Sequence, residues 1–512
     1  MIEREWREAS DLRTSRIALA VVLLSAAVLR LWAIDRGIPY AVAVDEPEIV
    51  ERSFNMMRSG SLHPHFFDYP GLSLYVQLAV SIVRFVAGAI AGEWYSLAQA
   101  TPSSFYLWGR VTTALIGAAT VLLVYQIGMR WGARHALLAA GLMAVLPLHV
   151  RYSHYVLTDT PLTFFVALTF LLSLVAHERG TLSSFAAAGA ASGLAAATKY
   201  NGGIALLMPV VACWMTHPLA PGRVKTILAT IAASGAAFLL CAPYTVLDLP
   251  AFLDSFARLA HQYRTATIGE SLWVLYFKYL VRHAFGWPAT LLALGGMGLG
   301  FVRLVRGPGR VRWMLVIIFP VVYYTMLTTQ KIVFARYLLP LTPSVCLLAA
   351  TGVVSGVSLL RRYEIPRAPR TALIAGLTIA ALLPPVIMSI RTDREMARSS
   401  TIDQAYAWIL QNIPAGASIV LERRAMQLPP TRYRASYIAQ LRQKTYEELR
   451  QEGIEYLVAN SEAYGTALTA PHKNPADYND YMRLFSQSRE LQTIAPSPEQ
   501  PGPEFRIFKV VP

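Results

Sequence analysis

Charged side chains are scarce in this chain of 512 residues, because only 15% of its positions carry Asp, Glu, Lys or Arg. Soluble domains average about 25% charged residues, so the composition excludes an ordinary soluble protein. Hydrophobic residues make up 54% of the chain, and the mean hydropathy is +0.41. Long apolar stretches recur through residues 1–390 and then stop. This pattern indicates a protein that crosses a membrane many times.

Cysteine is scarce as well. Cys213, Cys241 and Cys346 all lie in apolar stretches, and no CxxC pattern is present. This excludes a disulfide framework and predicts small buried side chains instead. The sequence also lacks a GxGxxG, P-loop, HExxH or serine-nucleophile motif in a supporting context. Its histidines do not have metal-ligand spacing, so we expect solvated or packed histidines rather than a metal centre.

Acidic residues are fewer than basic ones, 31 against 46, which gives a formal net charge of +15. In a soluble protein this excess would indicate a nucleic-acid partner. Residues 391–512 are nearly neutral, however, so the positive charge belongs to the membrane part and predicts cytoplasmic loops. We therefore expect no nucleic-acid partner. The first apolar run, residues 17–34, has no small-residue cleavage site after it and predicts an uncleaved anchor.

The apolar runs predict a mainly α, polytopic helical bundle of about eleven spans with a cytoplasmic N-terminus. Loops rich in Arg and Lys then all face the cytoplasm. All basic loops face the same side only if residues 71–92 do not cross the membrane. We therefore expect these residues, with Arg84 in their middle, to lie flat on its outer surface. The predicted spans are residues 17–34, 110–128, 135–150, 160–177, 183–198, 202–216, 225–242, 285–302, 313–329, 337–358 and 371–390.

Two parts of the chain follow from this topology. Residues 1–390 form the membrane domain, whose first outer loop spans residues 35–109 and carries interfacial helices. Residues 391–512 form a small extracytoplasmic α/β domain. In the second part, TIDQAYAWILQN predicts a helix, and SIVLE, IEYLVAN and FRIFKVV predict strands. Thr445, three residues before Glu448, predicts a capping box at the start of another helix.

Carboxylates gather at the outer ends of the predicted spans. Asp45 and Glu46 follow the first span closely, and the loop HVRYSHYVLTDTPL carries His154 and Asp159. Charged groups near a membrane are costly unless they are used, so they indicate a functional site. A structural interpretation also exists, because Asp45 and Asp159 have the sequence context of helix N-caps.

Cations are predicted at the same face. Arg110 opens a span, Lys199 lies in the turn KYNGG, and Arg336 lies in the segment ARYLLP. Carboxylates that face several cations suit a site that deprotonates one substrate and binds an anion, such as a lipid phosphate, on the other. The alternative is that these long side chains only extend to the membrane surface.

These residues resemble a known family. The sequence is similar to the GT-C glycosyltransferases, in the protein O-mannosyltransferase and aminoarabinose-transferase-like branch (glycosyltransferase family 39). The similarity is carried by the pair Asp45-Glu46, by the segment DYPGL before the interfacial helix, by LPLHVRYSHYVLTDTPLTFF, and by TKYNGG and ARYLLPLTP. Two departures occur: Pro70-Gly71 replaces the usual two prolines, and His154 stands where an arginine often precedes the loop aspartate.

The resemblance implies sugar transfer, with inversion, from a polyprenyl-phosphate-linked donor to a protein, lipid or glycan acceptor at the outer face of the cell inner (plasma) membrane. The catalytic residues that it implies are Asp45, as general base, with Glu46 and Asp159. The donor phosphate-binding residues that it implies are Arg110, Lys199, Arg336 and His154. The resemblance implies no metal or other cofactor, and a divalent cation is the second choice.

Two alternatives stay open. The first is a metal-dependent oligosaccharyltransferase or a glycan-polymerising enzyme of the same architecture. The second is a transporter for a lipid-linked sugar. Transporters place ionisable residues near the bilayer midplane on broken helices, often within inverted repeats. Here the acidic residues lie at predicted loop–membrane boundaries and no internal repeat is present, so the sequence favours an enzyme.

Overall fold

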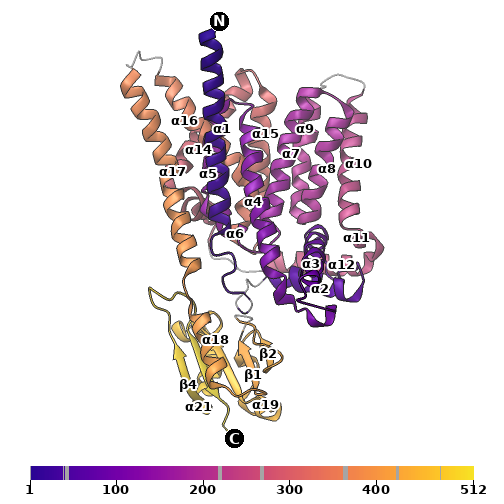
Figure 1. The fold of residues 1–512 in the computed structure, drawn as a ribbon, viewed down its shortest axis with the longest axis vertical. Helices are drawn as coiled ribbons and strands as arrows, with labels where there is room; N and C mark the ends of the chain where they lie inside the picture. The colour runs from indigo at the N-terminus through magenta and orange to yellow at the C-terminus, as the bar shows by residue number, and fades with distance from the viewer. Residues whose placement is uncertain are drawn as a thin grey trace. The chain divides into compact units, whose positions relative to one another are not determined.

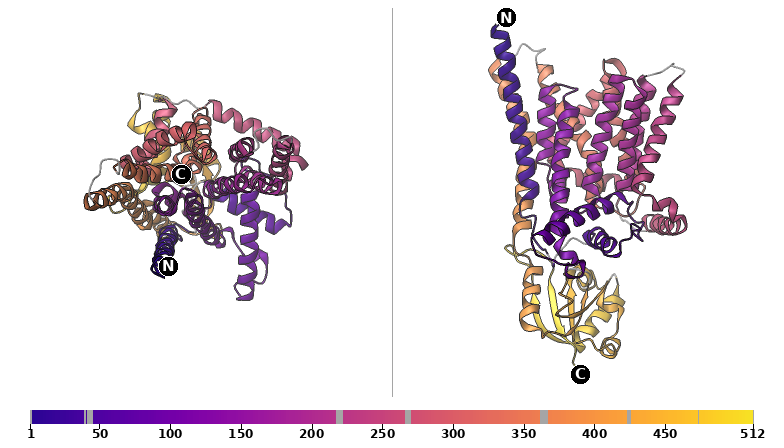
Figure 2. Two further views of the ribbon diagram at one scale, coloured as in Figure 1. Left: turned by 90° about the horizontal axis from the view of Figure 1, so that it is seen from above. Right: turned by 45° about the vertical axis from the view of Figure 1, so that its right-hand side comes forward.

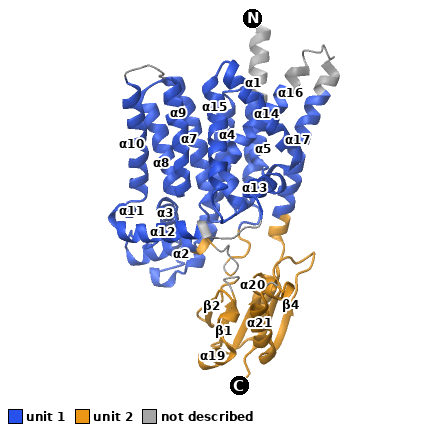
Figure 3. Ribbon diagram, turned by 180° about the vertical axis from the view of Figure 1, so that it is seen from behind, with its two compact units in different colours: residues 1–34, 48–393 blue, residues 35–47, 394–512 orange. Residues whose placement is uncertain are grey.

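The computed structural model describes residues 2–38, 40, 45–216, 222–265, 270–360, 367–422, 426–472 and 474–511. Its contacts divide the chain into two compact units (Figure 3). The first unit comprises residues 1–34 and 48–393, and the second comprises residues 35–47 and 394–512. All the described strands lie in the second unit. The predicted class, a mainly α membrane bundle with a small α/β domain, is confirmed.

Long helices of the first unit run side by side (Figures 1 and 2). Helices are expected here because a membrane offers no water to backbone groups, which must therefore bond within the segment. The long helices are α1 (Ile2–Leu31), α4 (Tyr106–Gly128), α7 (Asp159–Arg179), α8 (Leu182–Thr198), α10 (Arg223–Cys241), α14 (Gly286–Arg306), α15 (Arg310–Leu327), α16 (Thr342–Leu360) and α17 (Arg367–Ala397).

Shorter elements connect these helices. They are α2 (Glu46–Ser59), α3 (Leu72–Ile90), η1 (Leu97–Gln99), η2 (Pro102–Ser104), α5 (Ala133–Ala144), α6 (Pro147–Ser153), η3 (Tyr200–Leu206), α9 (Leu207–Thr216), α11 (Tyr244–Leu247), α12 (Leu249–Thr265), α13 (Leu272–Leu280), η4 (Val281–Phe285) and η5 (Ala335–Leu341). Each predicted span falls on one or two of the helical elements. Among the described residues, eight helices are long and apolar enough to cross a membrane, or nine if α5 and α6 form one bent span. A multi-pass membrane protein is therefore confirmed, and the count of about eleven spans stays a prediction.

Helix α3 differs from the long helices in direction. By length and composition it belongs to the eight possible spans. In Figures 1 and 2, however, it lies across the ends of the long helices rather than alongside them. Arg84 on α3 pairs with Glu93, and its guanidinium lies 4.6 Å from the ring centroid of Trp94. This orientation is the one expected for an interfacial helix.

The basic loops of the first unit lie together. Arg312, at the start of α15, donates a hydrogen bond to the carbonyl of Arg130, just after α4. The Arg130 Nε atom lies 3.3 Å from a carboxylate oxygen of Glu178, at the end of α7. Three loops that the positive-charge pattern places on one side of the membrane thus meet at one end of the bundle. Which side of the membrane this end faces stays a prediction.

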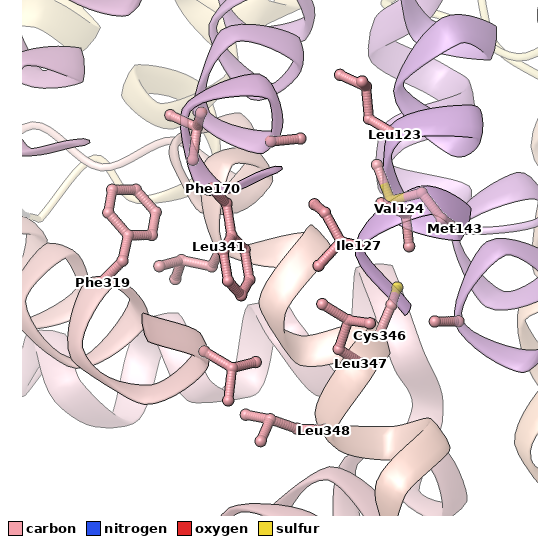
Figure 4. Packing of buried hydrophobic residues seen from close by; sticks show 14 of the residues in the cluster. Leu123, Val124, Ile127, Met143, Phe170, Phe319, Leu341, Cys346, Leu347 and Leu348 are labelled. Atoms are coloured by element: carbon pink, nitrogen blue, oxygen red, sulfur yellow. The ribbon is translucent and has the colours of Figure 1, made fainter. Parts of the chain in front are cut away.

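Buried side chains from several helices form the core of the first unit. Figure 4 shows side chains of α4, α7, α15 and α16, among them Ile127, Phe170 and Leu347, pointing toward one another. Cys346 lies in this core and is fully buried, as predicted for a small hydrophobic side chain. The dense apolar packing fixes the helix ends, and the polar residues of the candidate site lie at those ends.

The second unit contains a five-stranded sheet in the order β2-β1-β3-β5-β4. Strand β1 pairs in parallel with β2 and β3, and β5 pairs antiparallel with β3 and β4. The bounds are β1 (Ser418–Glu422), β2 (Arg434–Ile438), β3 (Tyr456–Asn460), β4 (Arg489–Ile494) and β5 (Phe505–Lys509), with helices α18 (Thr401–Asn412), α19 (Tyr446–Gln451), α20 (Ser461–Thr469) and α21 (Pro475–Gln487).

Successive side chains along β1 contribute alternately to two hydrophobic cores. Ile419 and Leu421 belong to the core that contains α18 residues, whereas Val420 belongs to the core that contains Phe485 of α21. This follows from the two-residue period of a strand. The predicted capping box is confirmed, because the Glu448 amide donates to the Thr445 hydroxyl at 3.2 Å and the Glu448 carboxylate accepts from the Thr445 amide at 2.7 Å.

The segment 35–47 joins the second unit through Tyr40. The Tyr40 hydroxyl donates to the Asp403 carboxylate at 2.6 Å. The Tyr40 ring stacks on that of Tyr406 with the centroids 4.0 Å apart. The Gln427 amide also donates to the Tyr40 carbonyl at 2.7 Å. A short segment from the start of the chain is thus held by residues more than 360 positions later.

Glu422, at the carboxyl end of β1, is a buried anchor of the second unit. It is 1% exposed and accepts hydrogen bonds from the backbone amides of Leu441 (2.8 Å) and Asn460 (2.9 Å) and from the Tyr481 hydroxyl. A buried carboxylate is tolerated when it is hydrogen-bonded in this way. Glu422 therefore ties the end of the neighbouring strand β3 and the segment that begins at Leu441 to β1.

We expect the substitution Glu422→Ala to lower the free energy of unfolding of the second unit by about 3 kcal/mol, because two buried amides lose their acceptor. Limited proteolysis of the full-length protein measures this as faster cleavage within residues 394–512. Glu447→Ala, which removes an exposed carboxylate of α19, is the matched control and should leave the cleavage rate nearly unchanged. Equal cleavage rates for both variants would contradict the anchoring role of Glu422.

Candidate active site

Asp159 is the centre of a buried ion-pair cluster. It is the first residue of α7 and is 2% exposed. The Lys199 Nζ atom donates to its Oδ1 atom at 2.8 Å, and the Arg336 Nε atom lies 3.4 Å from its Oδ2 atom. Thr158, not Asp159, is the N-cap residue of α7. Asp159 therefore acts through its two cations rather than as a helix cap.

The sequence KYNGG places Lys199 in this cluster. Helix α8 ends at Thr198, and Lys199 adopts an extended backbone before the turn η3 begins. The Gly202 amide donates to the Lys199 carbonyl at 2.8 Å and closes the turn. A Cβ atom on Gly202 would lie only 2.3 Å from the carbonyl oxygen of Ala195. Glycine is therefore required for the turn that directs Lys199 toward Asp159.

Aromatic rings surround both cations. The Lys199 Nζ atom lies 4.3 Å from the ring centroid of Tyr337, and the Arg336 guanidinium lies 4.3 Å from that of Phe334. The side chains of Lys199 and Arg336 are 12% and 15% exposed. They are thus held inside the protein beside Asp159 rather than extended to the membrane surface. The three charged groups alone carry one more positive than negative charge, which favours an anionic ligand.

Arg110 and His154 form a second polar group. Arg110 of α4 is 2% exposed and donates to the Ile34 carbonyl at 3.1 Å, and its charge interacts with that of His154. The His154 Nδ1 and Nε2 atoms lie 2.9 and 3.0 Å from the carbonyl oxygens of Val150 and Trp32. Burial lowers the pKa of His154, although these two carbonyls act in the opposite direction. Because both ring nitrogens contact carbonyls, phosphate binding by His154 would require those contacts to change, and the role stays a prediction.

The carboxylates of Asp45 and Glu46 lie at the start of α2. Asp45 is half-buried in the turn before the helix, and Glu46, its first residue, is fully buried. By their contacts both residues group with the second unit, whereas Asp159, Lys199 and Arg336 belong to the first. The structure thus brings together three of the predicted site residues, and the catalytic role of Asp45 and Glu46 stays a prediction.

Tyr337 and Tyr200, which neighbour Arg336 and Lys199 in the chain, make further contacts. The Tyr263 hydroxyl of α12 lies 2.7 Å from that of Tyr337, and the Tyr200 hydroxyl donates to the Phe67 carbonyl at 2.9 Å. The Asp68 carboxylate accepts from Arg258 at 2.8 Å. Sequence reasoning did not identify Tyr263 or Tyr337, because single tyrosines carry no distinguishing pattern in a chain that has 25 of them.

An apolar cavity lies next to the cluster. Its volume is about 200 Å³, and α3, α4 and α7 supply most of its lining, which includes Thr198, the neighbour of Lys199 in the chain. Among the residues that the structure describes, no three His, Cys, Asp or Glu side chains come together as a group that could hold a metal ion. Independence from a metal stays a prediction.

Comparisons with known proteins agree with this architecture. Residues 17–255 match the family of dolichyl-phosphate-mannose-protein mannosyltransferases. The apo oligosaccharyltransferase of Archaeoglobus fulgidus superposes with a TM-score of 0.59 and 13% identity, over 96% of this chain and 74% of its own. ArnT of Cupriavidus metallidurans, bound to undecaprenyl phosphate, superposes with a TM-score of 0.56 and 14% identity, over 96% and 98%. No curated protein matches the sequence.

These findings define the fold class of the protein. The chain has the fold of membrane glycosyltransferases of the GT-C type, as the sequence resemblance predicted, and part of it matches a mannosyltransferase family. Within this class, the mannosyltransferase family match covers its N-terminal part, residues 17–255, which contain Asp45, Arg110, Asp159 and Lys199.

We expect Gly202→Ala to destabilise the KYNGG turn by about 1–3 kcal/mol, because the added methyl group cannot fit beside the Ala195 carbonyl. A lower melting temperature of the detergent-solubilised protein would show this. Gly203→Ala is the matched control, since a Cβ atom there meets its nearest neighbour at an ordinary 3.8 Å. If both variants melt at the same temperature, the turn does not depend on close packing at Gly202.

Proposed function

We propose that this protein transfers a sugar from a polyprenyl-phosphate-linked donor to an acceptor at the extracytoplasmic face of the inner (plasma) membrane, with inversion at the anomeric carbon. The observation that supports the proposal most directly is the buried cluster of Asp159, Lys199 and Arg336, which combines an excess of positive charge with a neighbouring apolar cavity. A lipid-linked sugar phosphate has the matching combination of an anionic headgroup and an apolar tail.

Lys199 and Arg336 bind the donor phosphate in this proposal. Both now contact the carboxylate of Asp159. Phosphate oxygens can accept charge-assisted hydrogen bonds from the same nitrogen atoms. The cations then stabilise the negative charge that develops on the leaving polyprenyl phosphate as the glycosidic bond breaks. Arg110 and His154 are further phosphate-binding candidates, and the first prenyl units occupy the cavity whose lining includes Thr198.

Asp45 is the proposed general base, with Glu46 beside it. The acceptor oxygen forms its bond to the anomeric carbon on the face opposite to the phosphate, so a single displacement inverts the configuration. The acceptor proton passes to the Asp45 carboxylate, and the bonding electrons of the breaking bond leave with the phosphate. A sugar phosphate is a good leaving group and needs little acid assistance, whereas a hydroxyl nucleophile needs a base. Asp159 orients the acceptor or the base.

The second candidate is a metal-dependent oligosaccharyltransferase-like or glycan-polymerising reaction. The structural similarity to the Archaeoglobus fulgidus oligosaccharyltransferase keeps this candidate open. In that case the carboxylates of the site would hold a divalent cation. The transporter alternative is not favoured, because Asp159 begins α7 and Lys199 directly follows α8, so both lie at helix ends.

We expect Asp45→Asn to lower the rate of sugar transfer by about 10²- to 10⁴-fold, the usual effect of losing a positioned general base. Transfer from purified polyprenyl-phospho-sugars in liposomes measures this, with and without EDTA. Glu48→Gln, which removes a half-exposed carboxylate paired with Arg52, is the matched control and should retain wild-type activity. Full activity of Asp45→Asn would contradict the base assignment, and loss of wild-type activity in EDTA would favour the metal-dependent candidate.

The phosphate assignment has its own test, the binding of undecaprenyl phosphate measured by native mass spectrometry. Lys199→Met should weaken binding by roughly 10- to 100-fold, the size of a lost hydrogen bond to a charged group. Asp159→Asn should strengthen binding but slow transfer, because it removes the carboxylate that competes with the phosphate. Lys278→Met, at an exposed ion pair, is the control. Weaker binding by Asp159→Asn would show that the carboxylate positions the two cations rather than competing for them.

A further inference from the structure

Arg30 is a fully buried charge in α1 that caps another helix. Its Nη1 atom donates to the Ala144 carbonyl at 2.9 Å, and its Nη2 atom donates to the Met143 carbonyl at 3.0 Å. These carbonyls belong to the last two residues of α5. The last carbonyls of a helix have no partner within it, and a cation is favourable at that end. Arg30 therefore stabilises the point where α5 stops.

The end of α5 is a break inside an otherwise continuous apolar segment. Helix α6 begins at Pro147, and its axis is turned by 55° from that of α5. His149 of α6 lies with its Nδ1 atom 3.0 Å from the Arg30 Nη2 atom. Because a guanidinium only donates, His149 Nδ1 is the acceptor. Arg30 thus binds both sides of the break, and α6 leads through residues 154–158 to Asp159.

Helix α17 holds the break from a different direction. The Ser389 hydroxyl donates to the carbonyl of Val145, a residue within the break, at 2.8 Å. Asp393, one turn further along α17, is 4% exposed, and its charge attracts that of Arg30. Three elements that are far apart in the chain, α1, α17 and the α5–α6 pair, are therefore connected by polar groups at one buried point.

This cluster is not explained by stability. Four of its buried polar atoms have no hydrogen-bond partner among the described residues, namely Arg30 Nε, His149 Nε2 and both carboxylate oxygens of Asp393. Buried charged groups with incomplete hydrogen bonding are commonly less stable than apolar residues of similar volume. Buried polar groups that remain unsatisfied in a native structure call for another reason.

We propose that Arg30, His149 and Asp393 are positioning residues that fix the α5–α6 break and thereby place Asp159 between Lys199 and Arg336. The cluster determines where the connection of residues 154–158 leaves the bundle. None of the three residues contacts the substrate in this proposal. The expected effect on catalysis rests on the proposed function, whereas the expected effect on the local structure does not.

Hydrogen–deuterium exchange of the full-length protein in nanodiscs tests the structural part. Asp393→Asn leaves the buried guanidinium of Arg30 without its counter-charge, so we expect amides of residues 143–159 to exchange roughly tenfold faster or more while the rest of the first unit keeps its rates. Glu93→Gln, which breaks an exposed ion pair with Arg84, is the control and should change nothing in residues 143–159. Unchanged exchange in Asp393→Asn, or an equal increase throughout the first unit, would overturn the proposal.

A double variant separates capping from charge pairing. Arg30→Met combined with Asp393→Leu removes both charges, so no buried charge is left uncompensated. If Arg30 acts through the carbonyls of Met143 and Ala144, residues 143–159 still exchange faster than in the wild type. Slow, wild-type exchange in the double variant would overturn the positioning role of Arg30. Arg30→Lys should recover only part of the protection, because an ammonium lacks the planar fork that reaches two carbonyls and His149 together.

Kinetics tests the catalytic part. We expect Asp393→Asn to lower kcat by roughly 10- to 100-fold, because a displacement of about 1 Å far from the chemistry has effects of this size. The donor KM should not rise, since Lys199 and Arg336 lie on other elements and lose only a carboxylate that competes with the phosphate. A raised KM with unchanged kcat would overturn the positioning role. If the wild type transfers no sugar at all, the proposed function fails, and the exchange experiment still decides whether the cluster fixes the break.

Discussion

A helix that ends within or beside a membrane leaves backbone groups without water, and those groups need partners from elsewhere in the protein. This constraint explains the position of Arg30, and two charged residues of the candidate site also lie at helix ends. Arg30 supplies the partner at the end of α5, Lys199 follows the end of α8, and Asp159 begins α7. Helix ends and charged residues of the candidate site therefore occur at the same positions in the chain.

Asp159, Lys199 and Arg336 form the ion-pair cluster of the candidate site. One carboxylate with two cations is compact, nearly buried and still positively charged as a group. In a low-dielectric surrounding such a group holds an incoming anion more strongly than it would in water. Aromatic rings beside Lys199 and Arg336 exclude water, and the ring faces attract both cations. In the proposed function, these few residues bind the phosphate.

The sequence predicted the features that leave a regular pattern of apolar and charged residues along the chain. The spans follow from apolar runs, strands β1, β3 and β5 follow from apolar segments, and Asp159, Lys199 and Arg336 follow from their common position at loop boundaries. Strands β2 and β4 could not be predicted, because these edge strands are largely polar and exposed. Arg30 could not be identified either. A single arginine near the end of an apolar run has the same pattern whether it extends to the membrane surface or caps a distant helix.

Tyr40 has a consequence for how the molecule is made. Its hydroxyl, ring and carbonyl are held by Asp403, Tyr406 and Gln427, which the ribosome adds only after the whole membrane unit has been synthesised. Closing so long a loop carries an entropic cost, which the compact second unit must offset when it folds. The acidic pair Asp45-Glu46 follows Tyr40 by a few residues and groups with the second unit. A nascent chain that has inserted all its helices therefore still lacks the partners of Tyr40, and folding of the protein is completed near the place where its synthesis began.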